Sequence, residues 1–213
     1  MVIVLLGAPG AGKGTQAPIL ADRLDVPILA SGDLLRAEAR SGSELGREVD
    51  RIMKSGALVP DDTTVRIFLD RLDQPDASVG AILDGFPRTA AQAAALDAAL
   101  ASRGSRVDAA ILIDVPEDEL VERMSGRLIC RADSTHVYNI RSKPPRHDRV
   151  CDIDGADLYQ RSDDAPETVR ARMAQQLAPL AEVVGHYRSG GVLQTVDGRQ
   201  PIDVVTDEVL EVL

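Results

Sequence analysis

Aromatic residues, cysteines and long apolar runs are scarce in this chain, and each shortage excludes a class of protein. Trp is absent and only 2% of the 213 residues are aromatic, which leaves few rings for stacking on single-stranded nucleic acid. Two cysteines do not make the disulfide framework of a small secreted protein. The first residues lack a signal-peptide pattern, and no apolar run approaches the roughly 20 residues of a membrane span. We therefore expect a soluble cytoplasmic protein.

Positive charge is scarce overall but gathered in one segment. The formal net charge is −10, which repels polyanions unless basic residues cluster locally. Basic residues do cluster between Arg127 and Arg161. Hydrophobic residues make up 44% of the sequence, enough for one domain with a substantial core and room for inserted subdomains.

A glycine-rich segment follows the first apolar run, Val2–Leu6. Residues Gly7 to Lys13 fit the G-x-x-x-x-G-K pattern, with a predicted helix directly after it. Glycines let backbone N–H groups turn onto a polyphosphate, while the lysine and the helix N-terminus add positive charge. The pattern predicts a nucleotide site, against the alternative of a ligand-free turn. Gly14 follows the lysine, so the hydroxyl that often binds Mg²⁺ is delayed to Thr15.

Apolar runs alternate with stretches of helical spacing along the rest of the chain. The runs predict buried strands at Val2–Leu6, Pro27–Ala30, Ala81–Leu83, Ala109–Val115 and Val192–Val196. The intervening stretches predict helices at Thr15–Leu24, Gly32–Arg40, Leu45–Lys54, Asp62–Leu72, Thr89–Arg103, Glu117–Arg127, Pro166–Tyr187 and Pro201–Leu213. This alternation predicts an α/β fold with helices on both faces of a parallel sheet and ligands at its carboxyl edge. Pro179 should end or kink its helix.

One segment interrupts the alternation. Residues Leu128 to Leu158 are rich in Arg, Asp, Pro and Gly, contain Pro144-Pro145 and lack helical periodicity. They predict short strands and turns that form an inserted subdomain, with a disordered loop as the alternative.

Further polar motifs stand beside the predicted strands. The motif DGFPRT begins at Asp84 directly after a strand, and SGDLLR begins at Ser31 directly after another. The segment GALVPD ends at Asp61, and RSDD begins at Arg161, after the interrupting segment. Spacing alone would make DGFPRT a turn and Ser31 a helix N-cap.

Together with the loop GAPGAGKGT, these motifs resemble, in the same order, those of nucleoside monophosphate kinases, and in particular adenylate kinases of the long-lid bacterial type. The resemblance extends from residue 1 to about residue 200. It implies reversible transfer of the γ-phosphoryl group of Mg-ATP to AMP, giving two ADP. It also implies a P-loop three-layer fold with a central parallel five-stranded sheet as the core (1–29, 60–126 and 164–213), an AMP-binding helical subdomain (30–59) and a small β-rich lid (127–163).

The resemblance implies a role for each matching residue. The catalytic residues would be Lys13, Arg88, Arg123, Arg127, Arg161 and Arg172. The ATP site would consist of Gly10, Ala11, Gly12, Lys13, Gly14, Thr15, Arg123, Arg127, Tyr138 and Gln200. The AMP site would consist of Ser31, Arg36, Ala57, Leu58, Val59, Gly85, Arg88, Gln92, Arg161 and Arg172.

These residue types suit the implied chemistry. A phosphoryl group in transit spreads negative charge over its oxygens, and the planar fork of arginine contacts phosphate bidentately. Arg123 and Arg127 are four residues apart and would share a helix face. The amide of Gln92 can donate and accept at once, as the edge of adenine requires. Asp84, at the tip of its strand, would hold a water bound to Mg²⁺.

The interrupting segment also carries a candidate zinc site. Cys130-x-x-Asp133 and Cys151-x-x-Asp154 repeat like the ligand pairs of a zinc ribbon, with two thiolates exchanged for carboxylates. Four ionised groups without a metal would repel one another, which favours a bound Zn²⁺. A metal-free set with protonated thiols and a Cys130–Cys151 disulfide are the alternatives.

Three other functions stay open at this point. A related kinase would use another monophosphate acceptor, or GTP as the donor. A nucleotide sensor would bind without catalysis, and a zinc-ribbon protein would bind nucleic acid through the basic segment. We expect ATP, AMP and ADP as substrates, no nucleic-acid or membrane partner, and a monomer.

Overall fold

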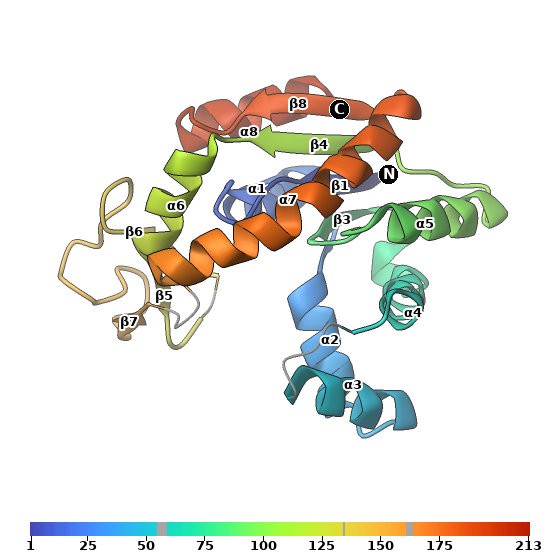
Figure 1. The fold of residues 1–213 in the computed structure, drawn as a ribbon, viewed down its shortest axis with the longest axis horizontal. Coiled ribbons are helices and arrows are strands. Elements are labelled where there is room, and N and C mark those ends of the chain that lie inside the picture. The colour runs from blue at the N-terminus through green and yellow to red at the C-terminus, as the bar shows by residue number, and fades with distance from the viewer. Residues whose placement is uncertain (55–58, 134, 161–163) are drawn as a thin grey trace.

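The computed structural model describes residues 1–54, 59–133, 135–160 and 164–213, and for Arg172 only its place in a helix. Five strands form one parallel sheet in the order β2-β3-β1-β4-β8 (Figure 1). They are β1 (Val2–Leu6), β2 (Ile28–Ala30), β3 (Ala81–Asp84), β4 (Ala109–Asp114) and β8 (Leu193–Asp197). Each predicted strand is confirmed to within one residue at either end.

The strand order reverses direction at β1. From β1 the chain passes to β2 and β3 on one side of the sheet, and later to β4 and β8 on the other side. Neighbouring connections therefore diverge at the carboxyl end of β1, which is where open α/β sheets bind ligands. The glycine-rich loop of residues 7–12, called the phosphate loop below, follows β1 directly and lies at the carboxyl end of this strand.

Helices flank the sheet and complete the alternation that the sequence predicts. They are α1 (Lys13–Leu24), α2 (Ser31–Arg40), α3 (Glu44–Lys54), α4 (Asp61–Leu72), α5 (Ala90–Ser102), α6 (Glu117–Ser125), α7 (Pro166–Ser189) and α8 (Ile202–Glu211). A short 3₁₀ turn spans Pro75–Ala77.

Two hydrophobic cores lie on the two faces of the sheet. Side chains alternate along a strand, so Ile3 and Leu5 of β1 enter one core while Val2, Val4 and Leu6 enter the other. The first core is covered by α1, α6, α8 and the start of α7, and the second by α4, α5 and the end of α7. All five residues of β1 are buried, which confirms the predicted three-layer α/β fold.

Helix α7 continues through Pro179. Its residues Val169 and Met173 pack in the first core, and Val183 and Tyr187 pack in the second. Pro179 therefore does not end the helix, and α7 joins the two cores across the sheet.

The segment that interrupts the alternation contains a second, antiparallel sheet. Its strands β5 (Arg127–Cys130), β6 (Val137–Asn139) and β7 (Leu158–Tyr159) pair in the order β6-β5-β7. We call the described residues between 127 and 160 the small-sheet unit. It has its own core of Leu128, Cys130, Tyr138, Cys151 and Leu158. The prediction of short strands and turns is confirmed for these residues.

The small-sheet unit and the α2–α3 pair both project from the central layers, in different directions (Figure 1). The two helices α2 and α3 pack against each other at the end of β2. No helix in the described part of the chain is long and apolar enough to cross a membrane.

Candidate functional site

The phosphate loop joins β1 to α1 through glycines that no other residue could replace. Gly7, Gly10 and Gly12 have positive φ angles of 148°, 88° and 110°. A Cβ at Gly10 would lie 2.8 Å from Cγ of Met124, and one at Gly7 would lie 2.9 Å from the carbonyl oxygen of Ile113. The loop thus packs tightly against α6 and β4, with the N-terminus of α1 at its end.

Lys13 folds back over this loop. Its Nζ donates to the carbonyl oxygens of Gly7 at 2.6 Å and Ala8 at 3.2 Å. Burial lowers the pKa of Lys13, and the nearby carboxylate of Asp84 partly offsets that shift. The ammonium group is therefore held in place by the loop. Asp84 does not fully offset the cost of burying the positive charge of Lys13, which favours binding of an anionic ligand.

Asp84 ends β3 beside two other strand ends. It pairs in register with Leu5 of β1 and Ala30 of β2. Burial raises the pKa of Asp84, while Lys13 and Arg88 act in the opposite direction. The sheet thus brings one carboxylate and two cations to the same edge.

The side chain of Arg88 contacts Ser31, the first residue of α2. Its Nη2 donates to Oγ of Ser31 at 2.9 Å, and its Nε donates to the carbonyl oxygen of Gly85 at 2.7 Å. Gly85 has φ of 73°, and a Cβ there would lie 2.7 Å from Oγ of Ser31. Glycine is needed so that the arginine and the serine can meet.

Gln92 is buried, with 5% of its surface exposed, and both ends of its amide have partners. Its Oε1 accepts the backbone N–H of Arg88 at 2.8 Å, and its Nε2 donates to Oδ1 of Asp61 at 2.7 Å. Oδ2 of Asp61 accepts the hydroxyl of Thr89 at 2.8 Å. Sequence reasoning missed Asp61 as a partner because the two residues are 31 positions apart.

Other predicted AMP-site residues lie around the same edge. Nη2 of Arg36 on α2 pairs with Oδ1 of Asp33 at 2.6 Å, and both side chains are largely exposed. Val59 is half-buried just before α4. Ala57 and Leu58 lie outside the described residues.

The arginines at the base of the small-sheet unit do not share a helix face. Helix α6 ends at Ser125 with Gly126 as its C-cap, so Arg127 begins β5 and the helix predicted to reach Arg127 is two residues too long. Arg123 pairs with Glu119 through Nη2 at 2.6 Å. Arg127 donates from Nε and Nη2 to both oxygens of Asp164, at 2.9 and 2.5 Å, and Asp164 is fully buried.

Two predicted catalytic arginines have no described side chain. Arg161 lies outside the described residues, and Arg172 lies on α7 without a described side chain.

The structure places Tyr138 in the core of the small-sheet unit. Its side chain is 3% exposed. Its hydroxyl accepts the backbone N–H of Asp152 at 2.8 Å. The ring thus packs inside the unit, and its contact with the donor nucleotide stays a prediction. Gln200, by contrast, is exposed in the turn after β8, where its N–H donates to the carbonyl oxygen of Asp197 at 3.3 Å.

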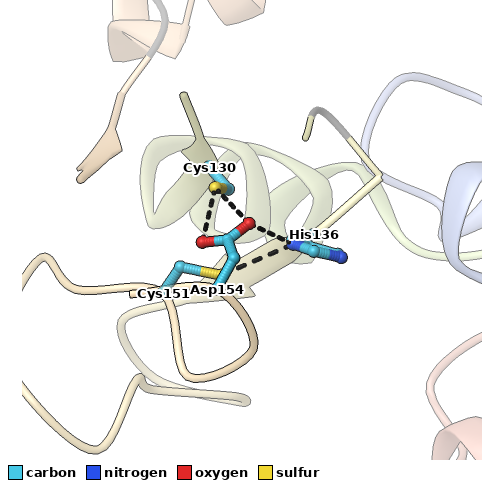
Figure 2. A group of neighbouring side chains, drawn as sticks. All are labelled: Cys130, His136, Cys151 and Asp154. Atoms are coloured by element: carbon cyan, nitrogen blue, oxygen red, sulfur yellow. Dashed lines mark hydrogen bonds and ion pairs between the residues drawn. The ribbon is translucent and has the colours of Figure 1, made fainter. Parts of the chain in front are cut away.

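Four side chains of the small-sheet unit converge on a candidate metal centre (Figure 2). The ligand atoms of Cys130, His136, Cys151 and Asp154 all lie within 4.8 Å of one another. Sγ of Cys130 lies 3.3 Å from Oδ2 of Asp154, and Nδ1 of His136 lies 3.0 Å from the same oxygen. Both cysteines are free thiols, so the Cys130–Cys151 disulfide does not form in this structure.

His136 replaces Asp133 in this group. The carboxylate of Asp133 turns away to accept from the N–H and hydroxyl of Thr135, at 2.8 and 2.7 Å. It lies 3.6 Å from Nε2 of His136, behind the imidazole. The repeated C-x-x-D spacing does not contain His136, and only the turn that closes from His136 N–H to the carbonyl oxygen of Asp133 brings it in.

Hydrogen bonds shift the protonation equilibria of the group. The backbone N–H of Ala156 and the thiol of Cys151 lower the pKa of Asp154 to about 2. Contacts with Cys151 and Asp154 outweigh burial and raise the pKa of His136. The set therefore holds one carboxylate at neutral pH and a histidine that prefers a proton or another cation.

Comparison with known proteins gives one consistent family. A family model described as adenylate kinase matches residues 5–192. The adenylate kinase of Streptomyces avermitilis is 46% identical over 213 residues, covering 100% of this chain and 97% of the relative. That of Kosmotoga olearia is 46% identical over 99% of this chain and 98% of the relative. That of Moorella thermoacetica is 47% identical over 96% of this chain and 94% of the relative.

Proposed function

Because the chain belongs to the adenylate kinase family, whose members transfer the γ-phosphoryl group of Mg-ATP reversibly to AMP, we propose how its own residues divide that reaction. The observation that carries the assignment is the meeting of Lys13, Asp84 and Arg88 beside the phosphate loop. One carboxylate between two cations at a helix N-terminus suits a polyphosphate and its magnesium ion.

The donor site consists of the phosphate loop and the residues after β8. Backbone N–H groups from Gly10 to Thr15 and the ammonium of Lys13 bind the donor phosphates, supported by the positive end of α1. Gln200 borders the donor base through its backbone. Magnesium supplies charge neutralisation when it arrives with ATP. The partly buried carboxylate of Asp84 fits a magnesium-bound water, and the hydroxyl of Thr15 lies on the first turn of α1.

The acceptor site lies on the other side of the same edge. Arg88 and Arg36 bind the AMP phosphate, while Ser31 and the carbonyl of Gly85 hold the guanidinium of Arg88 in position. Gln92 contacts the base, and residues Ala57, Leu58 and Val59 line its pocket. Residues 30–59, which include α2 and α3, therefore act as the AMP-binding subdomain. Residues 1–29, 60–126 and 164–213 form the core.

The migrating phosphoryl group is stabilised by arginines that come from outside the sheet edge. Arg123 and Arg127 stand where the small-sheet unit leaves α6, and Arg172 lies on α7. Arg161 is assigned to the same set from its motif RSDD in the sequence. Residues 127–163 act as a lid that brings these charges over the site and excludes water. An oxygen of the AMP phosphate then attacks the γ-phosphorus in line with the bond to the β–γ bridging oxygen of ATP, and that bond breaks as ADP leaves. No covalent intermediate with the protein is needed.

The candidate metal centre holds a structural Zn²⁺ in the lid. Two sulfur atoms, one nitrogen and one carboxylate oxygen make a four-ligand set that suits zinc. Asp133 then orients His136 from behind, as carboxylates commonly do for metal-bound histidines. Replacing His136 with Ala should abolish stoichiometric zinc, whereas Asp133→Ala should weaken zinc affinity about tenfold. Elemental analysis and a competing chelator distinguish the two outcomes, and equal loss in both variants would contradict the assignment.

We further propose that the enzyme works as a monomer in the cytoplasm. Its two cysteines are free thiols, which suits a reducing compartment. Sedimentation of the purified protein at several concentrations tests the monomer, and a concentration-dependent mass would refute it.

The roles are tested by measuring ADP formed from Mg-ATP with AMP, CMP, UMP or GMP as the acceptor. Lys13→Met should abolish turnover with AMP, and Arg88→Ala should reduce it by orders of magnitude while the fold stays intact. Near-normal turnover in Arg88→Ala would contradict its assignment to the acceptor phosphate.

A further inference from the structure

We propose that Asp61 is a positioning residue that locks the amide of Gln92 in one orientation, so that the acceptor site accepts a 6-aminopurine monophosphate and rejects a 6-oxopurine monophosphate. This inference rests on the proposed contact between Gln92 and the acceptor base.

Asp61 is the first residue of α4 and lies against the start of α5. Its two carboxylate oxygens accept from Nε2 of Gln92 at 2.7 Å and from the hydroxyl of Thr89 at 2.8 Å. The Thr89 oxygen in turn accepts the backbone N–H of Gln92 at 3.1 Å. Backbone and side chain of Gln92 are therefore both tied to the same pair of residues.

The partners of the amide allow one orientation only. A backbone N–H can only donate, so the one from Arg88 requires Oε1 of Gln92 on its side. An ionised carboxylate can only accept, so Asp61 requires Nε2 on the opposite side. Turning the amide over would place two acceptors against each other at Asp61 and two donors against each other at Arg88.

A locked amide distinguishes purines by their exocyclic group. After these contacts, Gln92 retains one N–H on Nε2 and one lone pair on Oε1 for a ligand. Adenine offers a donor at N6 beside an acceptor ring nitrogen, whereas a 6-oxopurine offers an acceptor at O6 beside a protonated N1. Since AMP is the substrate, the locked order is the one that matches adenine, and a 6-oxopurine meets it with both groups mismatched.

Asp61 is not required to cap α5. The side chain of Thr89 accepts the N–H of Gln92 and already serves as that cap. The neighbouring Asp62 supplies a matched control, because it lies in the same first turn of α4, is exposed, and accepts only a local N–H from Thr63 among the contacts of the described residues.

The test compares kcat/KM for AMP and for inosine monophosphate, which differ at position 6 and at the N1 proton, with Mg-ATP as the donor. The variants are Asp61→Ala, Asp61→Asn, Asp62→Ala, Gln92→Ala and the double variant Asp61→Ala/Gln92→Ala, with melting curves measured for each.

We expect Asp61→Ala to lower the AMP preference at least about tenfold, since the hydrogen bond to the carboxylate no longer opposes the turned amide that fits the wrong base. Asp61→Asn should retain part of the preference, because its amide still offers Gln92 an acceptor. Asp62→Ala should leave the preference unchanged. The double variant should not lower it below the value of Gln92→Ala, because Asp61 acts through Gln92.

Two failures are distinguishable. An unchanged preference in Gln92→Ala would refute the proposed base contact of Gln92 itself. A changed preference in Gln92→Ala with an unchanged one in Asp61→Ala, or equal losses for both substrates that follow the melting temperature, would overturn the role of Asp61 alone.

Discussion

Two arginines at the base of the lid have similar proposed roles and very different surroundings. Arg123 pairs with Glu119, and both side chains are partly exposed, at 26% and 34%. Arg127 pairs bidentately with Asp164, whose side chain has no exposed surface. A buried carboxylate that loses its partner costs far more than an accessible one, because water cannot replace the lost contact.

We therefore predict that Arg127→Ala lowers the free energy of unfolding by about 3 kcal/mol. Arg123→Ala should lower it by less than about 1 kcal/mol. Both variants should reduce turnover, because both arginines are proposed to stabilise the migrating phosphoryl group. Urea denaturation with parallel assays checks this, and equal destabilisation by the two variants would contradict the burial argument.

Asp84 makes stability and activity depend on pH in opposite directions. Its folded pKa lies above its unfolded value because burial dominates, so the folded state binds the proton more tightly. Stability should thus fall as pH rises from the unfolded pKa through the folded pKa, while the ionised form that is proposed to hold the magnesium-bound water becomes populated.

Asp84→Asn should therefore be more stable than the wild type at neutral pH, and the difference should vanish at pH below about 4. Its turnover with Mg-ATP should fall at least about a hundredfold. Melting temperatures and turnover measured across pH test both statements. A variant less stable than the wild type at neutral pH would show that the attraction to Lys13 outweighs the cost of burial.

At the scale of elements, the junction between α6 and the small-sheet unit closes the end of a helix with lid residues. The carbonyl oxygen of Arg123 accepts from Nδ2 of Asn139 at 2.8 Å, and that of Ser125 accepts from Nε2 of Gln160 at 2.6 Å. Helix ends leave such carbonyls without intrahelical partners. The small-sheet unit is thus attached to α6 through hydrogen bonds that cap the end of this helix.

The variant Asn139→Asp removes the hydrogen bond from Asn139 to the carbonyl oxygen of Arg123. Oδ1 of Asn139 also accepts the N–H groups of Arg141 and Ser142, and an aspartate keeps those contacts while losing the donor to Arg123. We expect amides of β5 and β6 to exchange with deuterium about fivefold faster, and amides of β1 at the unchanged rate. Equal acceleration in β1 would mean that the whole fold, and not the junction, is weakened.

In the molecule as a whole, the small-sheet unit has a core separate from the two cores of the sheet. Leu128, Tyr138 and Leu158 pack around the two cysteines, and these residues belong to neither sheet core. So small an apolar cluster would gain much of its stability from the proposed zinc ion, which would bind only the folded form.

Chelating a bound zinc ion should therefore lower the melting temperature of the small-sheet unit by at least about 15 °C. Zinc at a thousandfold excess over Kd contributes about 4 kcal/mol, and each kcal/mol shifts a small domain by about 4 °C or more. The helical signal in far-ultraviolet circular dichroism, which comes from the helices around the central sheet, should stay unchanged while the small-sheet unit melts. Calorimetry of the full chain with and without chelator measures this, using Cys151→Ser as the control that should not respond. A protein purified without zinc and insensitive to chelator would contradict the metal centre.

Much of the fold follows from local patterns that the sequence displays directly. Four strands of the sheet were predictable because each is largely a short apolar run, and burial on both faces leaves no polar positions in β1. The fifth, β8, is flanked by apolar residues but contains the exposed polar pair Gln194 and Thr195. The phosphate loop was predictable because Gly7, Gly10 and Gly12 must adopt positive φ angles, a requirement that no other residue type meets cheaply. These features depend on neighbours within one turn or one strand.

The differences between prediction and structure come from contacts between distant segments. Arg127 was placed on α6 because spacing does not show that the helix ends before Gly126. The burial of Tyr138 was not predicted because it depends on strands that pair across the small-sheet unit. Asp133 was assigned to the metal because the turn that substitutes His136 has no signature in the repeated spacing.

The α/β class, the nucleotide loop and the motifs of the kinase family could be predicted from the sequence alone, because each consists of residues a few positions apart. Folding brings together the side chains that share the carboxylate of Asp61, buries Tyr138 and gathers the four side chains of the candidate metal centre, and local sequence does not show these contacts. Those contacts join residues that are far apart in the sequence, such as His136 and Cys151, 15 positions apart, and Arg127 and Asp164, 37 positions apart. Local preferences favour no one of the many loops that could join such segments, and packing of the whole fold selects one of them.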